Sequence, residues 1–521
     1  GGIIYISGEN AQIIDSTMKQ AHAKSGGAIY VNGANTVING SSVSMVSADY
    51  NGGAIFIAGY KAIIENSSFD KSNATGYVNK GVHKEGNGGA IYVEGDSASI
   101  IDSKFNITIA VHGSGGAIYV GGQNTDISGI DTSISQAPNG QGGSIYVNGI
   151  NTDIEDSSLS ISHSGKEGGA IYIKGDNSKV INTTIERTSS DTDGGAVYID
   201  AKYASIEDSH FAMNNATNAG GAIYINGIHA NVINSTFNLT FARLSPTGYS
   251  TTNLGGAIYI KGDHANISDS KFANSFSYRG GMIYLQGSYC NVTNSSFENG
   301  YTSWDGGAIF ATGSYSNVYN SNFTNNVAKM DGGAIFWYGG KESTNNVVDG
   351  CIFTGNAAYP PSGTIQNVRT TRGGGAIYWS EGQKYGVVRN SQFINNSVHA
   401  AEKADGGAIL WDKANIEATI DNCTFDGNYV TTSANLTTKP WVQGGAIYAR
   451  PDGGKLVINN SEFRNCWSIR EAGALYVDSS NTLGIYVLNT KFINNTAKGV
   501  LATDADNDKG GGGAMIKGTK N

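Results

Sequence analysis

At positions 88–93 the chain reads Gly88-Gly89-Ala90-Ile91-Tyr92-Val93, and close copies of this phrase recur along all 521 residues. The commonest spacing between two copies is 26 residues. A repeat of fixed period indicates one structural unit per copy, each stacked on the next. The eighteen copies begin at Gly1, Gly26, Gly52, Gly88, Gly115, Gly142, Gly168, Gly194, Gly220, Gly255, Gly280, Gly306, Gly332, Gly374, Gly406, Gly444, Ala472 and Gly512.

A second phrase follows the first and usually ends in Phe. It reads Ile64-Glu65-Asn66-Ser67-Ser68-Phe69 in one repeat and Val292-Thr293-Asn294-Ser295-Ser296-Phe297 in another. Both phrases alternate with period two, are rich in β-branched and aromatic residues, and are bounded by Gly, Asn and Ser. The sequence therefore predicts an all-β fold, a single-stranded parallel β-helix of about 18 coils of about 26 residues.

Side-chain alternation assigns the two faces of the first strand. Ile91 and Val93 share one face, which we expect to be the core, while Tyr92 points the other way. The tyrosine position is aromatic in nearly every copy, which predicts an external aromatic ladder. The paired glycines fit a coil corner that needs positive φ or very close backbone approach.

Composition narrows the class of protein. The chain has 73 Gly, only 15% charged residues and a formal net charge of −9, so it has no basic surface that would attract nucleic acid. No apolar run approaches the roughly 18 residues of a membrane-spanning helix. The chain begins at Gly1 with no signal peptide, so we expect either a processed exported protein or a piece of a longer one.

The four cysteines match neither zinc-ligand spacing nor a redox pair. Cys351 and Cys423 both stand two residues before a Phe, with one coil between them. At about 9 to 10 Å they would lie beyond the reach of a disulfide. We expect buried thiols.

The pairing of GGAI with a downstream FxxN resembles chlamydial polymorphic outer-membrane proteins and the adhesin-like surface proteins of methanogenic archaea. The resemblance spans the chain, and it implies a right-handed parallel β-helix that is exported, displayed on the cell surface and active in adhesion. The archaeal group fits better, because the chain ends in a fresh GGGGAM copy rather than a membrane barrel. FxxN is complete at Phe211/Asn214, Phe323/Asn326, Phe353/Asn356, Phe393/Asn396, Phe425/Asn428 and Phe492/Asn495.

Extra residues in the longer repeats cluster after the Phe and before the next GG, so we expect them to leave the coil at one corner. Loops on a rigid scaffold often bind ligands, so we predict that this edge is a binding edge. The alternative is that the insertions have no function. Its candidate binding residues are Tyr359, Arg369, Arg372, Tyr429 and Trp441. The inserted segments are 70–87, 238–254, 354–373, 394–405, 426–443 and 493–511.

All six tryptophans follow residue 300, which divides the predicted β-helix into a regular part, 1–305, and a continuation with longer coils, 306–521. Trp337, Trp379 and Trp411 share one position in three consecutive coils. Two interpretations stay open: large core side chains in a wider coil, or an exposed stripe that stacks on sugars.

Parallel β-helices also host polysaccharide lyases and hydrolases, so an enzyme needs a specific candidate. Asp349, Arg389 and Asp421 stand four residues before the Phe of three consecutive coils and should face outward. Two carboxylates flanking an arginine could bind an acidic sugar or act as an acid/base pair, but they make an equally good ion-pair ladder. We expect no enzyme, with this column as the alternative.

An acidic loop near the end has carboxylates at Asp504, Asp506 and Asp508. Alternate carboxylates are typical of a calcium loop, although the Gly arrives one residue late and no Glu closes it. We expect no other cofactor, and a solvated acidic loop is the alternative to calcium.

Seventeen N-x-S/T sequons suggest a glycosylated surface protein. Stacked Asn and Ser at coil corners would, however, produce sequons without any modification. The candidate sites are Asn66, Asn73, Asn106, Asn182, Asn234, Asn291, Asn294, Asn435 and Asn494.

Together these features predict an extracellular, cell-surface, adhesin-like β-helix or surface-coat component. Its expected partner is a carbohydrate or a cell-surface receptor. Two alternatives remain at this stage: a polysaccharide lyase or glycoside hydrolase, and a self-associating filament or sheath subunit.

Overall fold

A computed structural model describes residues 1–79, 82–243, 251–339, 344–360, 373–380, 382, 384–401, 403–413, 416–434, 441–451, 453–478, 482–499 and 511–517. Every regular element among these residues is a β-strand. The chain comprises two compact units, unit 1 (Gly1–Ala265) and unit 2 (Asn266–Asn521). The sequence divides the β-helix at residue 305 instead, on the basis of coil length and tryptophan content. That division stays a prediction.

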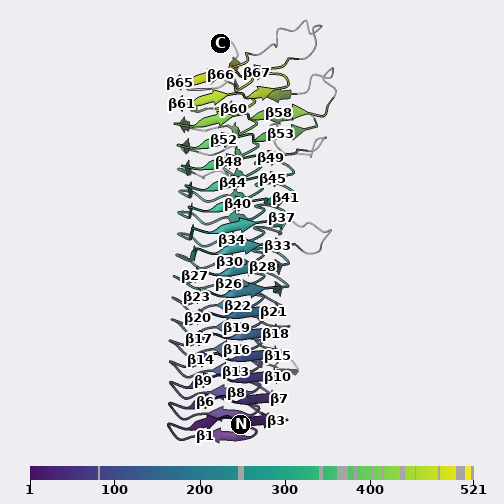
Figure 1. Cartoon of the computed structure of the whole chain (residues 1–521), viewed down its shortest axis with the longest axis vertical. Helices are drawn as coiled ribbons and strands as arrows, with labels where there is room; N and C mark the ends of the chain where they lie inside the picture. The colour runs from purple at the N-terminus through teal and green to yellow at the C-terminus, as the bar shows by residue number, and fades with distance from the viewer. Residues whose placement is uncertain are drawn as a thin grey trace. The chain divides into compact units, whose positions relative to one another are not determined.

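Each coil of unit 1 contributes strands to three parallel ladders (purple to teal in Figure 1). The first ladder is built by the GGAIY phrase and comprises β1 (Ile4–Ile6), β5 (Ile29–Val31), β8 (Ile55–Ile57), β13 (Ile91–Val93), β16 (Ile118–Val120), β19 (Ile145–Val147), β22 (Ile171–Ile173), β26 (Val197–Ile199), β30 (Ile223–Ile225) and β34 (Ile258–Ile260). The second comprises β2 (Gln12–Ile14), β6 (Val37–Asn39), β9 (Ile63–Glu65), β14 (Ser99–Ile101), β17 (Asp126–Ser128), β20 (Asp153–Glu155), β23 (Lys179–Ile181), β27 (Ser205–Glu207) and β31 (Asn231–Ile233).

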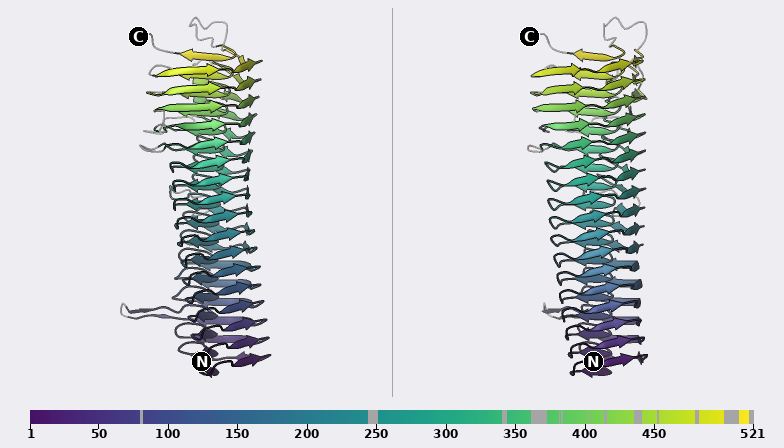
Figure 2. Two further views of the ribbon diagram at one scale, coloured as in Figure 1. Left: turned by 90° about the vertical axis from the view of Figure 1, so that its left-hand side faces the viewer. Right: turned by 60° about the vertical axis from the view of Figure 1, so that its left-hand side comes forward.

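The third ladder of unit 1 contains the second-phrase Phe and bends at a corner, which divides it into two strands in several coils. It comprises β3 (Thr17–Lys19), β4 (His22–Ala23), β7 (Ser42–Ala48), β10 (Ser68–Ala74), β15 (Lys104–Ala110), β18 (Asp131–Ala137), β21 (Ser158–Ser164), β24 (Thr184–Glu186), β25 (Ser189–Ser190), β28 (His210–Ala212), β29 (Asn215–Ala216), β32 (Thr236–Asn238) and β33 (Phe241–Ala242). The insertion after β10 forms an antiparallel hairpin, β11 (Tyr77–Asn79) and β12 (Val82–Lys84), which stands away from the coils in the left view of Figure 2.

Unit 2 repeats the arrangement (teal to yellow in Figure 1). Its first ladder comprises β38 (Ile283–Leu285), β42 (Ile309–Ala311), β46 (Ile335–Trp337), β50 (Ile377–Trp379), β55 (Ile409–Asp412), β60 (Ile447–Arg450), β64 (Leu475–Asp478) and β68 (Ala514–Lys517). The second comprises β35 (Asn266–Ser268), β39 (Asn291–Thr293), β43 (Asn317–Tyr319), β47 (Val347–Asp349), β51 (Gly386–Arg389), β56 (Glu417–Asp421), β61 (Lys455–Asn459) and β65 (Gly484–Leu488).

The third ladder of unit 2 has two strands in each coil, and its insertions add a further small sheet of β54 (Lys403–Asp405) and β59 (Trp441–Gln443). The ladder comprises β36 (Lys271–Ala273), β37 (Phe276–Ser277), β40 (Ser296–Glu298), β41 (Tyr301–Thr302), β44 (Asn322–Thr324), β45 (Val327–Ala328), β48 (Ile352–Thr354), β49 (Ala357–Ala358), β52 (Gln392–Ile394), β53 (Ser397–Ala400), β57 (Thr424–Asp426), β58 (Tyr429–Thr432), β62 (Glu462–Arg464), β63 (Trp467–Ser468), β66 (Lys491–Ile493) and β67 (Thr496–Ala497).

The paired glycines meet both backbone demands expected of a corner. Gly88 has a φ of 65°, in the left-handed region that favours glycine. A Cβ on Gly89 would overlap the backbone carbonyl oxygen of Gly116 in the next coil. The two positions therefore require glycine for two different reasons.

The core follows the predicted alternation. Ile91 and Val93 are fully buried, and Phe69 stacks on Phe105 with ring centroids 5.1 Å apart. In unit 2 eight Phe rings stack in the same way, at 4.6 to 5.0 Å: Phe272, Phe297, Phe323, Phe353, Phe393, Phe425, Phe463 and Phe492.

The FxxN motif is explained by a buried asparagine ladder in unit 2. The backbone N–H of Asn356 donates to Oδ1 of Asn396, and that of Asn396 donates to Oδ1 of Asn428. The Nδ2 of Asn396 also donates to the backbone carbonyl of Phe353 at 3.0 Å. Each amide thus satisfies backbone groups that the corner would otherwise leave unpaired.

The tyrosine ladder lies outside the coils, as the alternation predicts, and most of its rings are buried or half-buried. Tyr5 is 63% exposed, whereas Tyr172 is 6% and Tyr378 is 0% exposed. Successive rings stack at about 5 Å, as Tyr146 and Tyr172 do at 5.0 Å, so each ring covers the faces of its neighbours. The ladder is mainly a packing device.

Candidate functional site

The predicted binding edge of unit 2 carries a row of aromatic side chains on β53, β58 and the neighbouring coils. Tyr359 and His399 stack with ring centroids 5.7 Å apart, and His399 meets Tyr429 edge-on at 5.9 Å. Tyr429 in turn stacks on Trp467 at 4.7 Å. We call Tyr359, His399, Tyr429 and Trp467 the aromatic row.

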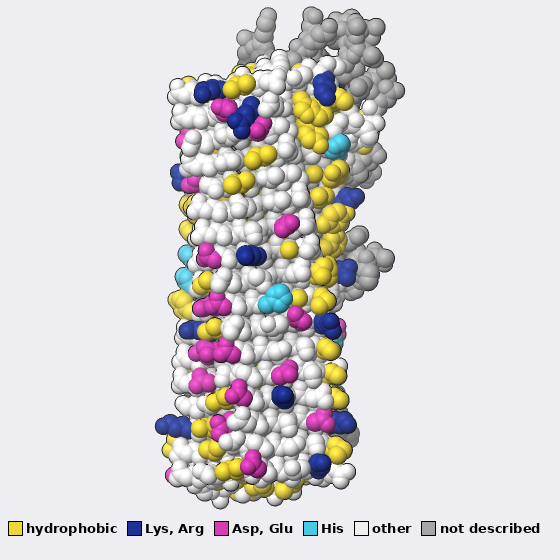
Figure 3. Space-filling model, viewed as in Figure 1, with side chains coloured by type: hydrophobic (Ala, Val, Ile, Leu, Met, Phe, Trp, Pro, Cys, Tyr) yellow, Lys and Arg dark blue, Asp and Glu magenta, His cyan; other side chains and the backbone are white. Residues whose placement is uncertain are grey.

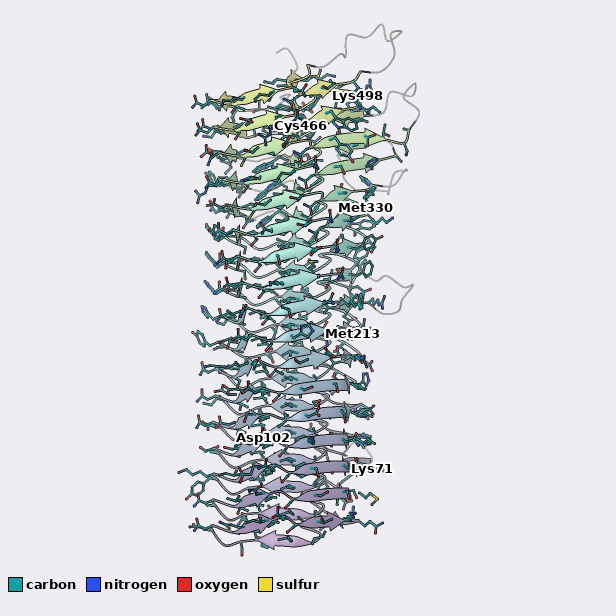
Figure 4. All side chains as sticks on the ribbon, in the orientation of Figure 1. Lys71, Asp102, Met213, Met330, Cys466 and Lys498 are labelled. Atoms are coloured by element: carbon teal, nitrogen blue, oxygen red, sulfur yellow. The ribbon has the colours of Figure 1, made fainter. Side chains whose placement is uncertain are left out.

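The aromatic row ends in a cation. The Nζ of Lys498 lies 3.8 Å from the ring centroid of Trp467, a cation–π contact. Lys498 is labelled on the right-hand flank in Figure 4. Tyr359 is 43% exposed and His399 is also exposed, whereas Tyr429 and Trp467 are half-buried. Partial burial lowers the pKa of His399, which favours the neutral ring at neutral pH.

Trp441 lies beside this row on β59 and is 57% exposed. Its position is fixed by the next two residues. Val442 is fully buried in a small cluster formed largely by the edge strands, and the Nε2 of Gln443 donates to Oε2 of Glu471 at 2.7 Å. Lys403 on β54 is the register partner of Trp441, so the two side chains leave the small sheet on the same face.

The cluster beneath the edge explains why these strands form there. It comprises Ala358, Val398, Ala400, Ala404, Val430 and Val442, with Ile469 packed against it. Burying this separate apolar patch holds the inserted strands against the coil, at roughly 25 cal/mol for each Å² of apolar surface removed from water. The insertions at 394–405 and 426–443 are therefore partly structured rather than loose decoration.

The sequence reasoning identified three of these side chains, Tyr359, Tyr429 and Trp441. It missed His399, Trp467, Lys498 and Lys403. Aligning every repeat on its Phe would have found the first three, because Tyr429 and Trp467 both stand four residues after a Phe, and Tyr359, His399 and Lys498 all stand six residues after one. The predicted Arg369 and Arg372 lie outside the described residues.

The structure corrects the interpretation of the three aligned tryptophans as an exposed stripe that stacks on sugars. Trp337, Trp379 and Trp411 are 0 to 1% exposed and stack on one another at 4.9 Å. A Cβ added to Gly386 would lie 2.7 Å from Trp411, so small residues opposite make room for the indoles. These rings fill a wider coil and cannot present a face to a ligand.

The column proposed for catalysis has the geometry of a polar ladder. The Nε of Arg389 lies 2.8 Å from Oδ2 of Asp349, and this contact raises the pKa of the guanidinium. Asp421 Oδ1 accepts from the Nδ2 atoms of Asn459 and Asn460, both at 3.1 Å. All three side chains therefore have polar partners along the ladder. This is the arrangement expected of the ion-pair ladder, which was the alternative to a catalytic pair.

The sequon asparagines also belong to ladders. Asn66, Asn182, Asn234, Asn294 and Asn494 occupy corners with φ between 45° and 51°. Their Nδ2 atoms donate to the Asn or Asp of the preceding coil, as do those of Asn106 and Asn291. Asn73 lies half-buried on β10, and Asn435 lies outside the described residues.

In the described parts of the chain, no group of three or more His, Cys, Asp or Glu side chains could hold a metal ion. The calcium candidates Asp504, Asp506 and Asp508 lie outside those parts. Across the same residues, no helix is long and apolar enough to cross a membrane.

All four cysteines are buried and free, as expected for Cys351 and Cys423. Burial raises the pKa of the Cys351 and Cys423 thiols to about 12, which keeps them protonated and unreactive.

A family model described as the right-handed β-helix region matches residues 248–438 and 358–509, which together span just over half of the chain. The chain belongs to the right-handed β-helix family. This match supplies the handedness of the coil. Among curated proteins, none matches the chain.

Several solved structures resemble this right-handed β-helix at low identity. PfbA, a surface adhesin of Streptococcus pneumoniae, is 13% identical over 81% of this chain and 89% of its own, with a TM-score of 0.30. A mutant tailspike protein of E. coli bacteriophage HK620, in complex with a pentasaccharide, is 14% identical over 77% of this chain and 72% of its own, with a TM-score of 0.33.

A third solved structure is a mannuronic acid specific polysaccharide family 6 lyase from human gut microbiota. It is 10% identical over 83% of this chain and 87% of its own, with a TM-score of 0.34. At these identities and TM-scores, the three likenesses carry no argument about the function of this β-helix.

Proposed function

We propose that the chain is an adhesin-like, cell-surface β-helix that binds carbohydrate at the edge of unit 2. The observation that carries this proposal is the exposure of Trp441, which is 57% exposed on a strand fixed by buried neighbours. An exposed indole on a rigid strand offers an aromatic face that suits the apolar C–H face of a sugar ring.

The neighbouring groups supply the polar contacts that a glycan needs. Lys403 shares the face of Trp441, and the aromatic row presents the Tyr359 hydroxyl and the neutral His399 ring to solvent. Phenol, ammonium and imidazole groups can all hydrogen-bond to sugar hydroxyls. The exposed Lys498 side chain and the half-buried Lys403 side chain also favour a glycan that carries carboxylates.

The GGAI–FxxN resemblance supports the same function. It relates the chain to exported surface proteins of methanogenic archaea and of chlamydial type, both assigned to adhesion. We therefore propose that the β-helix lies outside the cell, with the edge of unit 2 presented to glycans of another cell or of the surface coat. Calcium at Asp504, Asp506 and Asp508 is a separate proposal, tested by adding a chelator to the same binding assay.

A broad glycan array tests the proposal with the purified full chain. We expect selective binding to a small set of glycans and loss of most signal in Trp441→Ala. Tyr486→Ala is the matched control, because Tyr486 is 48% exposed in unit 2 on β65, in a different ladder. Failure of the wild type to bind, or equal loss in both variants, would count against the Trp441 site.

A further inference from the structure

Aromatic side chains also line the edge of unit 2 in its first coils. Phe276 on β37 stacks on Tyr301 on β41 with ring centroids 5.3 Å apart, and Tyr278 stacks on Trp304 at 5.3 Å. All four side chains are half-buried, so each keeps part of its surface in contact with water. We call Phe276, Tyr278, Tyr301 and Trp304 the second aromatic cluster.

The second aromatic cluster and the aromatic row lie on one line of the surface. Phe276 and Tyr301 stand four residues after the second-phrase Phe of their coils, as Tyr429 and Trp467 do. This flank carries the labels β37, β41, β45, β49, β53 and β58 on the right of Figure 1, and hydrophobic side chains gather along it in Figure 3. Successive register partners form what we call the edge line: Phe276, Tyr301, Val327, Ala357, Ser397, Tyr429 and Trp467.

The middle of the edge line is covered, but the surface beside it is exposed. Ala357 and Ser397 are only 5% and 6% exposed. Two residues further along three successive coils, the side chains of Lys329, Tyr359 and His399 are exposed. A ligand that follows the edge line would therefore contact these three side chains between the second aromatic cluster and the rest of the aromatic row.

Unit 1 shows that the corner does not need aromatic rings. Its coils pair there in the same parallel register, and its residues at this position are mostly polar, with Ile109 and Phe241 as the exceptions. The fold therefore does not require the stacked rings of unit 2, and their exposed surfaces are available to a ligand. The polar residues of unit 1 are His22, Ser47, Asn73, Gln136, His163, Ser189 and Asn215.

Charge along the edge favours an anionic ligand. On the edge line and two residues after it, the coils of unit 2 carry two lysines, Lys329 and Lys498, and no acidic residue. Both lysines are exposed. Unit 1 instead mixes acids, Asp49 and Asp191, with cations at these positions. Sugars that carry carboxylates match the charge of unit 2 better than neutral sugars do.

We propose that the glycan bound at the edge of unit 2 is a linear, uronate-containing chain that lies along the edge line and contacts both the second aromatic cluster and the aromatic row. Six coil steps separate Phe276 from Trp467, or about 29 Å at about 4.8 Å for each step, so only a chain of several sugar rings reaches both. Once one end is bound, contact at the other is intramolecular, which raises affinity. This inference rests on the proposed function and adds the length, direction and charge of the ligand.

Titration calorimetry of the full chain with oligogalacturonates of increasing length tests this inference. A trimer is too short to reach both groups of aromatic side chains, whereas a dodecamer is long enough. We expect the dodecamer to bind at least about tenfold more tightly than the trimer. A maltooligosaccharide of the same length as the dodecamer carries no charge and should bind more weakly.

The decisive variant combines Tyr278→Thr and Tyr301→Gln, which introduces residues that unit 1 has at the same positions, Thr217 and Gln136. The corner should therefore fold as before, and an unchanged melting temperature checks this. We expect the affinity for the dodecamer to fall nearly to that for the trimer, while the affinity for the trimer stays unchanged. Tyr315→Asn is the matched control, because Tyr315 is 41% exposed at another corner of unit 2, between β42 and β43.

An affinity that does not rise with chain length overturns the inference, as does a double variant that binds the dodecamer like the wild type or a neutral chain that binds equally well. In each of these cases, trimer binding that is lost in Trp441→Ala would still support the proposed function. If no oligogalacturonate binds, the inference is overturned as well, and the glycan array decides the proposed function by itself.

Discussion

The backbone carbonyl oxygen of Gly116 occupies the space that a Cβ on Gly89 would need. Because the obstacle is backbone of the next coil, no side-chain movement can relieve it. We expect Gly89→Ala to lower the thermal unfolding temperature sharply or to prevent accumulation of soluble protein. Gly8→Ala is the control, since nothing lies within 4 Å of a Cβ there. Equal behaviour of the two variants would mean that coils are not held this close.

Trp379 stacks between Trp337 and Trp411 and is fully buried. We expect Trp379→Ala to destabilise unit 2 by about 3–5 kcal/mol, the range for removing a large aromatic side chain from a packed core. Thermal unfolding and limited proteolysis of unit 2 would measure the loss. Tyr385→Ala, at a residue 46% exposed, should change stability little. A wild-type melting curve for Trp379→Ala would contradict the core assignment.

Asp193 gives unit 1 a pH-dependent contribution to stability. Burial raises the pKa of its carboxyl to about 6, even though its Oδ1 accepts a hydrogen bond from the backbone N–H of Ala219 at 3.0 Å. The folded pKa exceeds the usual value of about 3.9, so this contribution is fully present below about pH 4 and is lost as the pH rises through 6.

Asp193→Asn removes the ionisation while keeping an oxygen that can accept from Ala219. The variant should therefore be more stable than the wild type at pH 8, and the difference should shrink toward pH 4. Hydrogen exchange of the segment around Ala219, compared between the two proteins at each pH, would show it. A difference that does not vary with pH would be inconsistent with a raised pKa.

Burial of the cysteine thiols predicts that they are unreactive in the folded protein. With the pKa of Cys351 and Cys423 raised to about 12 by burial, neither should react with a thiol reagent in the native protein at pH 8. Both should react after denaturation, without prior reduction, because the cysteines are free. Mass spectrometry of alkylated peptides reads out each site, and rapid labelling of native protein would show that the core is open there.

The sequence predicted the fold well because the alternation and spacing within each repeat indicate where the strands, corners and core residues lie. Alternation in Ile91-Tyr92-Val93 assigned the core, and the GG pair marked the tight corner. The outward direction of the aromatic ladder was also predicted. Alternation shows which way a ring points, whereas the stacking of Tyr146 on Tyr172 decides how much of it water reaches.

The candidate site could be predicted only in part. The insertion pattern located the edge, and Trp441 was expected to be exposed there, as it is. The pairing of β54 with β59 joins segments almost forty residues apart, and no period marks it. The sequence therefore gave no sign that Lys403 lies next to Trp441, and its role at the edge could not be inferred from the repeat.

The most direct test of the account is a binding isotherm of the full chain with the strongest glycan from the array, measured for the wild type and for Trp441→Ala. We expect the dissociation constant to rise at least about tenfold in the variant, equivalent to about 1.4 kcal/mol, while the melting temperature is unchanged. An identical dissociation constant for both proteins would contradict a carbohydrate site at Trp441.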